Sequence, residues 1–163
     1  MTDAEPAAPA GTPQWARTYR DNAPRLMALA TVLVGRDDAC DLVADSVIRA
    51  VHSPSWPTVQ DHRAFLVRSL VNEASSRHRS NVRRLRREER VAQRDGDHRL
   101  DPADLLDVRT ALSRLSQQQR VIVYLAYWED LSIGDIARWL AVGEGTVRRQ
   151  LDRAKSKLRE VLK

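Results

Sequence analysis

The chain has 163 residues, which is enough for one ordinary domain or two small ones. Apolar residues make up 42% of it and aromatic residues only 5%, which argues against a bulky aromatic-lined ligand pocket. The single cysteine, Cys40, excludes a disulfide framework and a zinc cluster. The chain has no long alternating pattern, no membrane-length apolar run and no secretory signal, so we expect a cytoplasmic helical protein without membrane insertion.

Charge is distributed in blocks along the chain, with a net total of +5. Residues 1–76 and 91–107 are weakly acidic, whereas residues 77–90 and 108–163 each carry a surplus of five positive charges. Two basic blocks separated by an acidic strip fit a polyanionic partner such as nucleic acid. Charge alone leaves open the alternative that arginine-rich helix ends only solvate the fold.

The first predicted helix runs from about residue 13 to residue 34. Leu26, Leu29 and neighbouring apolar residues recur at helical spacing and form one face. Pro24 should kink or break this helix, and Gly35 is suited to end it.

Two further helices follow in the N-terminal half. Asp37 or Asp38 can cap the second helix, which reaches about residue 52. Two prolines and two serines prevent helix formation over residues 53–58. Asp61 can cap a third helix that continues directly into the arginine block.

The C-terminal half predicts a linker and at least three more helices. Periodicity is lost over residues 91–101, which indicates a flexible acidic linker, and a helix should follow from Pro102 to Leu115. Ser116 and Ser132 have the spacing of capping residues and open two further helices. We therefore predict an all-α fold of two small helical domains joined by a flexible linker. The predicted parts are a disordered tail at 1–14, a first domain at 15–90, the linker at 91–103 and a second domain at 104–163.

The last two predicted helices have the pattern of a DNA-binding helix-turn-helix. A short amphipathic helix from Ser132 to Leu140 is followed by a three-residue turn containing Gly143 and by a second helix from Glu144 to about Leu162. An ordinary helical hairpin with a basic surface is the alternative.

The outward face of the second helix can be placed by its 100° rotation per residue. Val147, Leu151 and Ala154 point inward, so the opposite side carries the predicted DNA contacts. Arginines near the start of such a helix can read guanine, and a glutamate can accept from cytosine. The predicted contacts are Glu144, Thr146, Arg148, Arg149, Arg153 and Lys155, of which the last two suit phosphates.

These residues resemble a known family. The run Leu131–Ala137, the run Gly145–Arg148 and the triplet Arg153–Lys155 resemble the C-terminal promoter-reading domain of bacterial sigma factors. The segment Leu115–Val121 resembles the opening of that domain, with Ser116 in place of a proline. This domain alone is shared with many response regulators.

The N-terminal half strengthens the resemblance. Asp41–Val43 with Arg49 resembles the polymerase-binding helix of sigma factors, and Ala64–Arg68 with Asn72 resembles their −10-reading helix. Order and spacing are similar to the extracytoplasmic-function group over about residues 15–90 and 104–162. The chain departs from the usual pattern at a few positions. These are Ala44-Asp45 for Gln-Glu, Ser46-Val47 for Val-Phe, Phe65 for Trp, Gly143 for a capping Ser and Gln150 for Arg.

The resemblance implies an alternative sigma factor that binds core RNA polymerase and directs it to promoter DNA. Its second helix would dock on a coiled coil of the largest polymerase subunit, and its C-terminal domain on the flap. The implied polymerase-binding residues are Asp41, Leu42, Asp45 and Arg49. Without the resemblance, the same helix face fits solvated surface with Leu42 in the core.

The resemblance also implies that bases of the −10 element are pulled into a pocket beside the third helix. The implied −10 contacts are Trp56, Gln60, Arg68, Asn72, Arg77, Arg79, Arg83 and Arg84. Trp56 could stack on a base or serve as a packing plug, and Asn72 could bond a base edge or lie on the surface. The acidic linker could enter the RNA-exit channel or act as a plain tether.

Three other functions compete with this interpretation. A stand-alone helix-turn-helix regulator would bind DNA without polymerase, and an RNA-binding adaptor would use only the arginine block. An enzyme is disfavoured because four scattered histidines, one cysteine and no glycine-rich phosphate loop form no catalytic constellation. We therefore expect no catalysis, no metal and no cofactor, with an anti-sigma factor as a common partner of the group.

Overall fold

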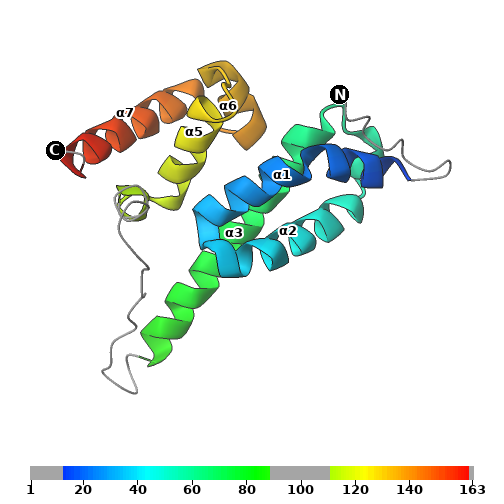
Figure 1. Cartoon of the computed structure of the whole chain (residues 1–163), viewed down its shortest axis with the longest axis horizontal. Helices are drawn as coiled ribbons and strands as arrows, with labels where there is room; N and C mark the ends of the chain where they lie inside the picture. Colours follow the sequence, from blue (N-terminus) through cyan, green and yellow to red (C-terminus); the bar gives the residue numbers. More distant parts are fainter. Residues whose placement is uncertain (1–12, 89–110, 162–163) are drawn as a thin grey trace, which may run out of the picture.

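A computed structural model describes residues 13–88 and 111–161, and within these ranges every regular element is a helix. Figure 1 shows two helical units side by side, one built from α1, α2 and α3 and the other from α5, α6 and α7. This arrangement confirms the predicted all-α fold. In the described part of the chain, no helix combines the length and the apolar character that a bilayer crossing requires.

The N-terminal unit contains three long helices and one short turn. Helix α1 spans Gln14–Val34, α2 spans Arg36–Val51 and α3 spans His62–Glu88, with a 3₁₀ turn, η1, at Trp56–Thr58. Gly35 separates α1 from α2 with a φ of 87°, a conformation that glycine adopts without a Cβ clash.

Three local predictions for this unit need correction. Helix α1 continues through Pro24, so the break that was predicted as one of two outcomes does not occur; the buried residues Leu26, Leu29 and Leu33 that follow hold the helix together despite one missing hydrogen bond. Asp37 and Asp38 do not cap α2 but lie in its first turn, where their charge favours the helix dipole. Part of the segment predicted as non-helical forms the turn η1.

The start of α3 follows the prediction. The Asp61 carboxylate accepts a hydrogen bond from the Ala64 amide at 2.9 Å, and the helix then runs without interruption through the arginine block to Glu88. Figure 1 shows that the second half of α3 extends beyond its neighbours α1 and α2. The arginine block therefore projects from the packed part of the molecule.

The C-terminal unit is organised by two capping serines. Helix α5 spans Gln117–Tyr127, α6 spans Ile133–Leu140 and α7 spans Glu144–Val161. Ser116 and Gln119 form the reciprocal capping box of α5, and the Ser132 hydroxyl accepts from the Asp135 amide at the start of α6. The predicted linker and most of the predicted helix at 102–115 lie outside the described residues.

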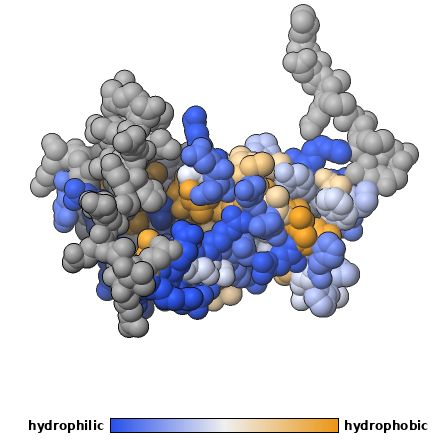
Figure 2. Space-filling view, turned by 90° about the horizontal axis from the view of Figure 1, so that it is seen from below, coloured by the Kyte–Doolittle hydropathy of each residue, from blue (hydrophilic) through white to orange (hydrophobic). Residues whose placement is uncertain are grey.

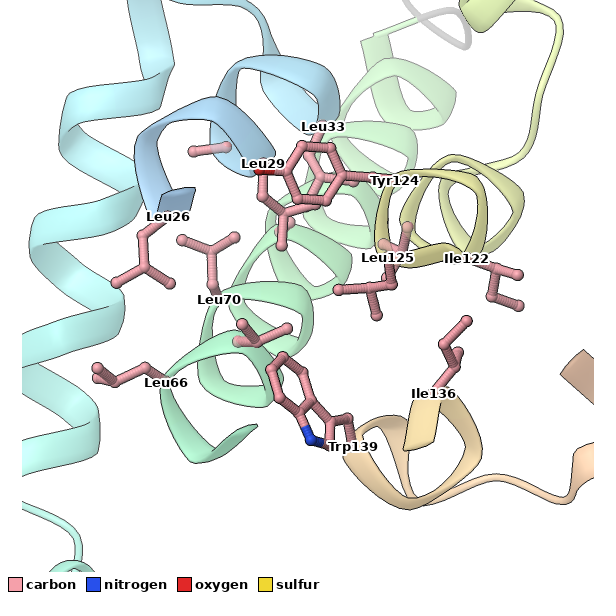
Figure 3. Packing of buried hydrophobic residues seen from close by; sticks show 14 of the residues in the cluster. Leu26, Leu29, Leu33, Leu66, Leu70, Ile122, Tyr124, Leu125, Ile136 and Trp139 are labelled. Carbon is pink, nitrogen blue, oxygen red and sulfur yellow. The ribbon is translucent and has the colours of Figure 1, made fainter. Parts of the chain in front are cut away.

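One hydrophobic core joins the two units. Leu26, Leu29, Leu33, Leu66 and Leu70 of the first unit belong to the same buried cluster as residues of the second unit. Figure 3 shows Tyr124 and Leu125 of α5 and Trp139 of α6 on the side that faces α1 and α3. The two units are therefore packed against each other through apolar side chains.

Candidate nucleic-acid interface

Helices α6 and α7 form a helix-turn-helix with a fully buried joint. Ile136, Val147 and Ala154 have no solvent exposure, and Ala137 and Leu151 are also buried. These five positions are the inward residues that helical periodicity predicts. Their burial sets the rotation of α7 and leaves the opposite face of that helix in solvent.

The turn between these helices is not built as expected from its glycine. The left-handed residue is Ala141, with a φ of 54°, rather than Gly143. The Ala141 amide bonds to the carbonyls of Ala137 and Arg138, and the Val142 amide lies 3.0 Å from the Ala137 oxygen. These bonds close the end of α6 and offset the strain of a left-handed alanine.

None of the six predicted contacts of α7 belongs to the buried stripe of that helix. Glu144, Arg148, Arg149 and Arg153 are exposed, and Thr146 and Lys155 are half-buried. Glu144 and Arg148 form an ion pair of 3.4 Å one turn apart. Among the described residues, Arg149 and Arg153 make no ion pair, so their guanidinium groups are available to a ligand.

Gln150, where related sequences often have arginine, has a structural role here. Its side-chain oxygen accepts from the Gln119 amide nitrogen at 3.2 Å. Gln119 is buried, and its own oxygen accepts from Ser116 and from Lys157. Gln150 therefore fastens α7 to the first turn of α5 instead of extending the basic face.

A groove of about 230 Å³ lies between the end of α2 and the middle of α3. Arg68 and Asn72 line it one turn apart, together with Arg49 and Ser53. Asn72 is exposed, so its amide faces a concave polar surface. The structure thus unites two of the predicted −10 contacts in one groove, whereas Gln60 is exposed outside it.

Trp56 occupies a packed position rather than an open platform. It is only 9% exposed, and its ring meets His62 and Phe65 edge-on, with centroid separations of 4.5 Å and 6.0 Å. A base stacks on an exposed ring face, and Trp56 has little exposed surface. Of the two predicted roles of Trp56, the burial therefore favours packing over stacking on a base.

The predicted polymerase-binding face of α2 has a different apolar member. Leu42 has no exposed surface, so its side chain belongs to the core and cannot meet a partner. Ile48 is 58% exposed and lies at helical spacing from Asp41 and Asp45. Ile48 stands among charged residues in the sequence, which could have marked it as part of an interface. Periodicity alone did not distinguish it from the apolar residues of the core.

The charged residues of this face are tied to α3 by ion pairs. Glu73 pairs with Arg49 at 3.1 Å and with Arg77 at 3.3 Å. Arg77 also pairs with Asp45, and its guanidinium donates to the Asp41 carbonyl at 3.4 Å. Two predicted polymerase contacts and one predicted DNA contact are therefore members of a single network.

The remaining predicted −10 contacts lie further along α3. Arg79, Arg83 and Arg84 are exposed, and Arg83 donates to the Ser80 hydroxyl at 3.4 Å. Figure 2 shows hydrophilic side chains over much of one face of the molecule, with smaller hydrophobic areas among them. Over residues 13–88 and 111–161 no group of three metal-ligating side chains occurs, and Cys40 is exposed.

A polar cluster between the two units escaped prediction from the sequence. Glu129, whose side chain is only 6% exposed, pairs with Arg63 and, at 3.4 Å, with Arg25. The Tyr124 hydroxyl lies 3.3 Å from Glu129 and donates to the Arg25 carbonyl at 3.2 Å. Burial, reinforced by the Glu129 charge, raises the pKa of Tyr124 to about 12.

Arg120 makes a second polar contact between the units. Its guanidinium donates to the carbonyls of Val32 and Leu33, at 3.2 Å and 3.3 Å, at the end of α1. Burial lowers the pKa of Arg120 below its usual value. No periodicity or motif in the sequence indicates such contacts, because the partners are more than 80 residues apart.

Comparison with known proteins places these features in a wider context. The family described as "Sigma-70, region 4" matches residues 105–158. The RNA polymerase sigma-E factor of Streptomyces coelicolor is 32% identical over 132 residues, covering 77% of this chain and 72% of its own length. The sigma-E factor of Streptomyces antibioticus is 30% identical over 129 residues, covering 77% and 71%.

A solved structure is similar over nearly the whole chain. It is the sigma factor RpoE from Bartonella quintana, crystallised in complex with the anti-sigma factor NepR. The match has a TM-score of 0.73 and 27% sequence identity, and it covers 91% of this chain and 96% of the other.

Proposed function

The chain belongs to the extracytoplasmic-function group of RNA polymerase sigma factors, and we propose that its two helical units divide promoter recognition between them. It is an alternative sigma factor, with RNA polymerase and promoter DNA as partners. In the proposed division, residues 15–90 bind core polymerase and the −10 element. Residues 104–163 read the −35 element.

The observation that carries the −35 assignment is the exposure of Arg149 and Arg153 on α7, which form no ion pair with any residue that the structure describes. A recognition helix enters the major groove by its N-terminal residues, where Arg149 can bond the guanine O6 and N7 atoms and Thr146 can contact a neighbouring base. Glu144 holds Arg148 and can accept from a cytosine amino group. Arg153 and Lys155 then contact phosphates, which fix the register of the helix but carry no sequence information.

The −10 assignment is supported by the groove between α2 and α3. Asn72 presents both donor and acceptor atoms to an unpaired base, and Arg68 lies one turn away. Arg79, Arg83 and Arg84 extend along the projecting half of α3 and would hold phosphates of the opened strand, with a strong dependence on salt. Gln60 lies on the loop before α3 and would contribute at the edge of this site.

Polymerase binding is assigned to the exposed face of α2. Asp41, Asp45 and Arg49 supply charge, and Ile48 supplies the apolar contact that the buried Leu42 cannot make. Interfaces commonly combine a small apolar centre with a charged rim. The ion pairs of Asp45 and Arg49 with α3 must rearrange or be shared when the polymerase helices arrive.

We also propose how and where the protein acts. As a transcription initiation factor it would act by binding and carry out no reaction of its own, and it would work in the cytoplasm, where RNA polymerase is found. The Bartonella sigma factor was crystallised with an anti-sigma factor. An anti-sigma partner is accordingly expected for this chain, and co-purification from its host would test that expectation.

Run-off transcription tests the proposed function directly. Purified core polymerase is incubated with fragmented host DNA, with and without the protein. New start sites that depend on the protein would support a sigma factor, and their alignment would define both promoter elements. Tight DNA binding without polymerase, together with no new transcripts, would instead indicate a stand-alone regulator.

The division between the two units needs a second experiment on one such promoter. Asn72→Ala should lower transcription and reduce its sensitivity to mutations in the −10 element. Arg149→Ala should lower transcription and reduce its sensitivity to mutations in the −35 element. Ser156→Ala, an exposed change on α7, is the matched control. If both variants lost sensitivity to mutations in the same promoter element, the proposed division between the two units would be wrong.

A further inference from the structure

Two polar side chains of α7 reach back to the start of α5. Gln150 and Lys157 are seven residues apart, so at 100° per residue they point within about 20° of each other. The Gln150 Oε1 accepts from the Gln119 Nε2 at 3.2 Å, and the Lys157 Nζ donates to the Gln119 Oε1 at 3.3 Å. The same ammonium group donates to the Arg114 carbonyl at 3.3 Å. These three hydrogen bonds form the α7 clamp.

The α5 end of the clamp is itself held in place. Gln119 is only 4% exposed, and its side-chain oxygen also accepts from the Ser116 amide at 3.0 Å, which is one half of the capping box of α5. The Ser116 hydroxyl accepts from the Gln119 amide at 3.2 Å. A buried side-chain amide with both its oxygen and its nitrogen bonded has little freedom to turn. The clamp therefore ties α7 to a fixed point of α5.

The apolar joint of α7 restricts the rotation of this helix less sharply than the clamp does. Val147, Leu151 and Ala154 are buried, but apolar contacts are non-directional and tolerate small rotations. A hydrogen bond requires a particular distance and angle, so turning α7 about its axis would stretch both of its side-chain bonds to Gln119. The clamp is thus the directional contact that sets how α7 is turned.

The residues proposed to read bases lie beside the clamp on the helix. Thr146 precedes Gln150 by one turn, and Arg149 is its neighbour in sequence. Side chains on a helix surface lie about 6 Å from the axis, so a rotation of about 15° displaces them by about 1.5 Å. That displacement exceeds the spread of about 0.5 Å in hydrogen-bond distances and would break a bidentate contact with guanine. A contact with phosphate carries no base information and does not need the same alignment.

We propose that Gln119 and Gln150 are positioning residues for base recognition, and that their hydrogen bond sets the rotation of α7 at which Arg149 and Thr146 meet the base edges of the −35 element. The proposal rests on the proposed function of α7. Neither glutamine has to touch DNA. Related sequences often have arginine at position 150, so this chain exchanges one basic side chain for a fixed rotation of its recognition helix.

Base discrimination by the holoenzyme tests the clamp. The measured quantity is the ratio of affinities for a native promoter and for its variant at the base pair that Arg149 reads. Gln150→Leu removes the acceptor without changing the charge, and it should lower this ratio about tenfold, within the range that one bidentate base contact supplies. Binding to unrelated DNA should remain the same, because that binding depends on charge.

A conservative variant and a matched control separate positioning from stability. Gln150→Glu keeps an acceptor for the Gln119 amide and should retain the ratio, although its negative charge weakens binding to every sequence. Gln118→Leu makes the same chemical change at the exposed neighbour of Gln119 and should leave the ratio unchanged. Lys157→Met removes only the other side-chain bond to Gln119 and should lower the ratio by a smaller factor. Circular dichroism verifies that each variant remains helical.

An equal loss of affinity for every sequence in Gln150→Leu, with the ratio retained, would show that the bond only stabilises the fold and would overturn the proposal. Loss of the ratio in Gln150→Glu as well as in Gln150→Leu would also overturn it, because the first variant still accepts from Gln119.

Side-chain amide signals in nuclear magnetic resonance spectra report the clamp in the free, full-length protein, without DNA. The bonded amide proton of Gln119 should exchange slowly with solvent in the wild-type protein and in Gln150→Glu, and faster in Gln150→Leu. Fast exchange in the wild-type protein would overturn the clamp. Slow exchange together with a wild-type holoenzyme that shows no preference at the −35 element would contradict the proposed function of α7, and with it the role of the clamp in reading bases.

Discussion

The two helical units present their binding residues in opposite states. On α7, Arg149 and Arg153 are exposed and make no ion pair within the described residues. In the N-terminal unit, Asp45, Arg49 and Arg77 are joined by ion pairs, and Arg68 is bonded to the backbone of α6. The C-terminal unit is ready for a ligand, whereas the N-terminal unit must first exchange internal partners for external ones.

This difference has an energetic consequence. An exposed guanidinium loses water when it binds DNA, but it gives up no other protein contact. The residues of the α2–α3 network are partly exposed, so each pair contributes little by itself, and their loss is compensated by a partner of matching charge. We therefore expect DNA recognition by α7 to depend mainly on the base sequence. Recognition by α2 and α3 should depend on the order in which their internal contacts are broken and contacts with the partner are formed.

The largest expected effect is on stability, and it distinguishes a core residue of α2 from a residue of its proposed polymerase-binding face. Leu42→Ala should lower the free energy of unfolding by about 2–5 kcal/mol, because the side chain is fully buried. Ile48→Ala should change stability by no more than about 0.5 kcal/mol and weaken binding to core polymerase. Urea denaturation and a polymerase-binding titration measure the two effects. A stable Leu42→Ala variant with poor polymerase binding would reverse the roles of these residues.

A smaller effect separates base reading from phosphate contact on α7. Arg149→Ala should reduce promoter affinity of the holoenzyme by about 1–3 kcal/mol and relax the preference at one base pair of the −35 element. Arg153→Ala should weaken all sequences alike and reduce the salt dependence by about one counterion. Binding to a set of single-base promoter variants at two salt concentrations distinguishes them. An equal loss on every sequence for Arg149→Ala would exclude a base contact.

The cap of α6 should matter less than either of these changes. Ser132→Ala removes the hydroxyl that accepts from the Asp135 amide and should cost about 0.5–2 kcal/mol of stability. Ser132→Thr keeps a capping hydroxyl and serves as the control. Thermal unfolding followed by helical ellipticity measures the difference, and equal midpoints for the two variants would show that the cap does not contribute.

The smallest effect concerns alkaline pH at the interface between the units. The folded pKa of Tyr124, about 12, lies above its ordinary value of 10.0, so the neutral hydroxyl stabilises the folded state fully below pH 10. That contribution is lost as the pH rises from 10 through 12. Tyrosinate absorbance should therefore show a late ionisation that Tyr124→Phe removes, and an unchanged titration curve in this variant would contradict the assignment.

Local signals in the sequence predicted much of the fold. Ser116, Ser132 and Asp61 cap their helices as expected, because a cap involves residues only three positions apart. The inward face of α7 followed from periodicity for the same reason. Pro24 was predicted to kink or break α1, and no break occurs, because packing of the rest of the helix outweighs one missing hydrogen bond.

The sequence predicted the candidate site correctly only where the proposed binding residues are also exposed in the structure. Four of the six predicted residues of α7 are exposed and two are half-buried, whereas Leu42 and Trp56 are buried and Ile48 was overlooked. Periodicity predicts which face of a helix is buried, but it does not fix where the buried face ends. The reason is that each residue turns the helix by 100°, so neighbouring positions differ widely in direction. Burial of Trp56 depends on His62 and Phe65, which reach it only after the loop has folded.

By itself, the sequence determined the helices, three of their caps, the helix-turn-helix and the family, because all of these rest on neighbours a few residues apart or on motifs in a set order. Only the tertiary structure decided that Glu129 meets Arg63, that Arg68 caps α6 and that Arg120 caps α1. These pairs are separated by more than 60 residues. Such contacts form when burial of apolar surface brings two units together, and no local pattern specifies which charges will then be adjacent.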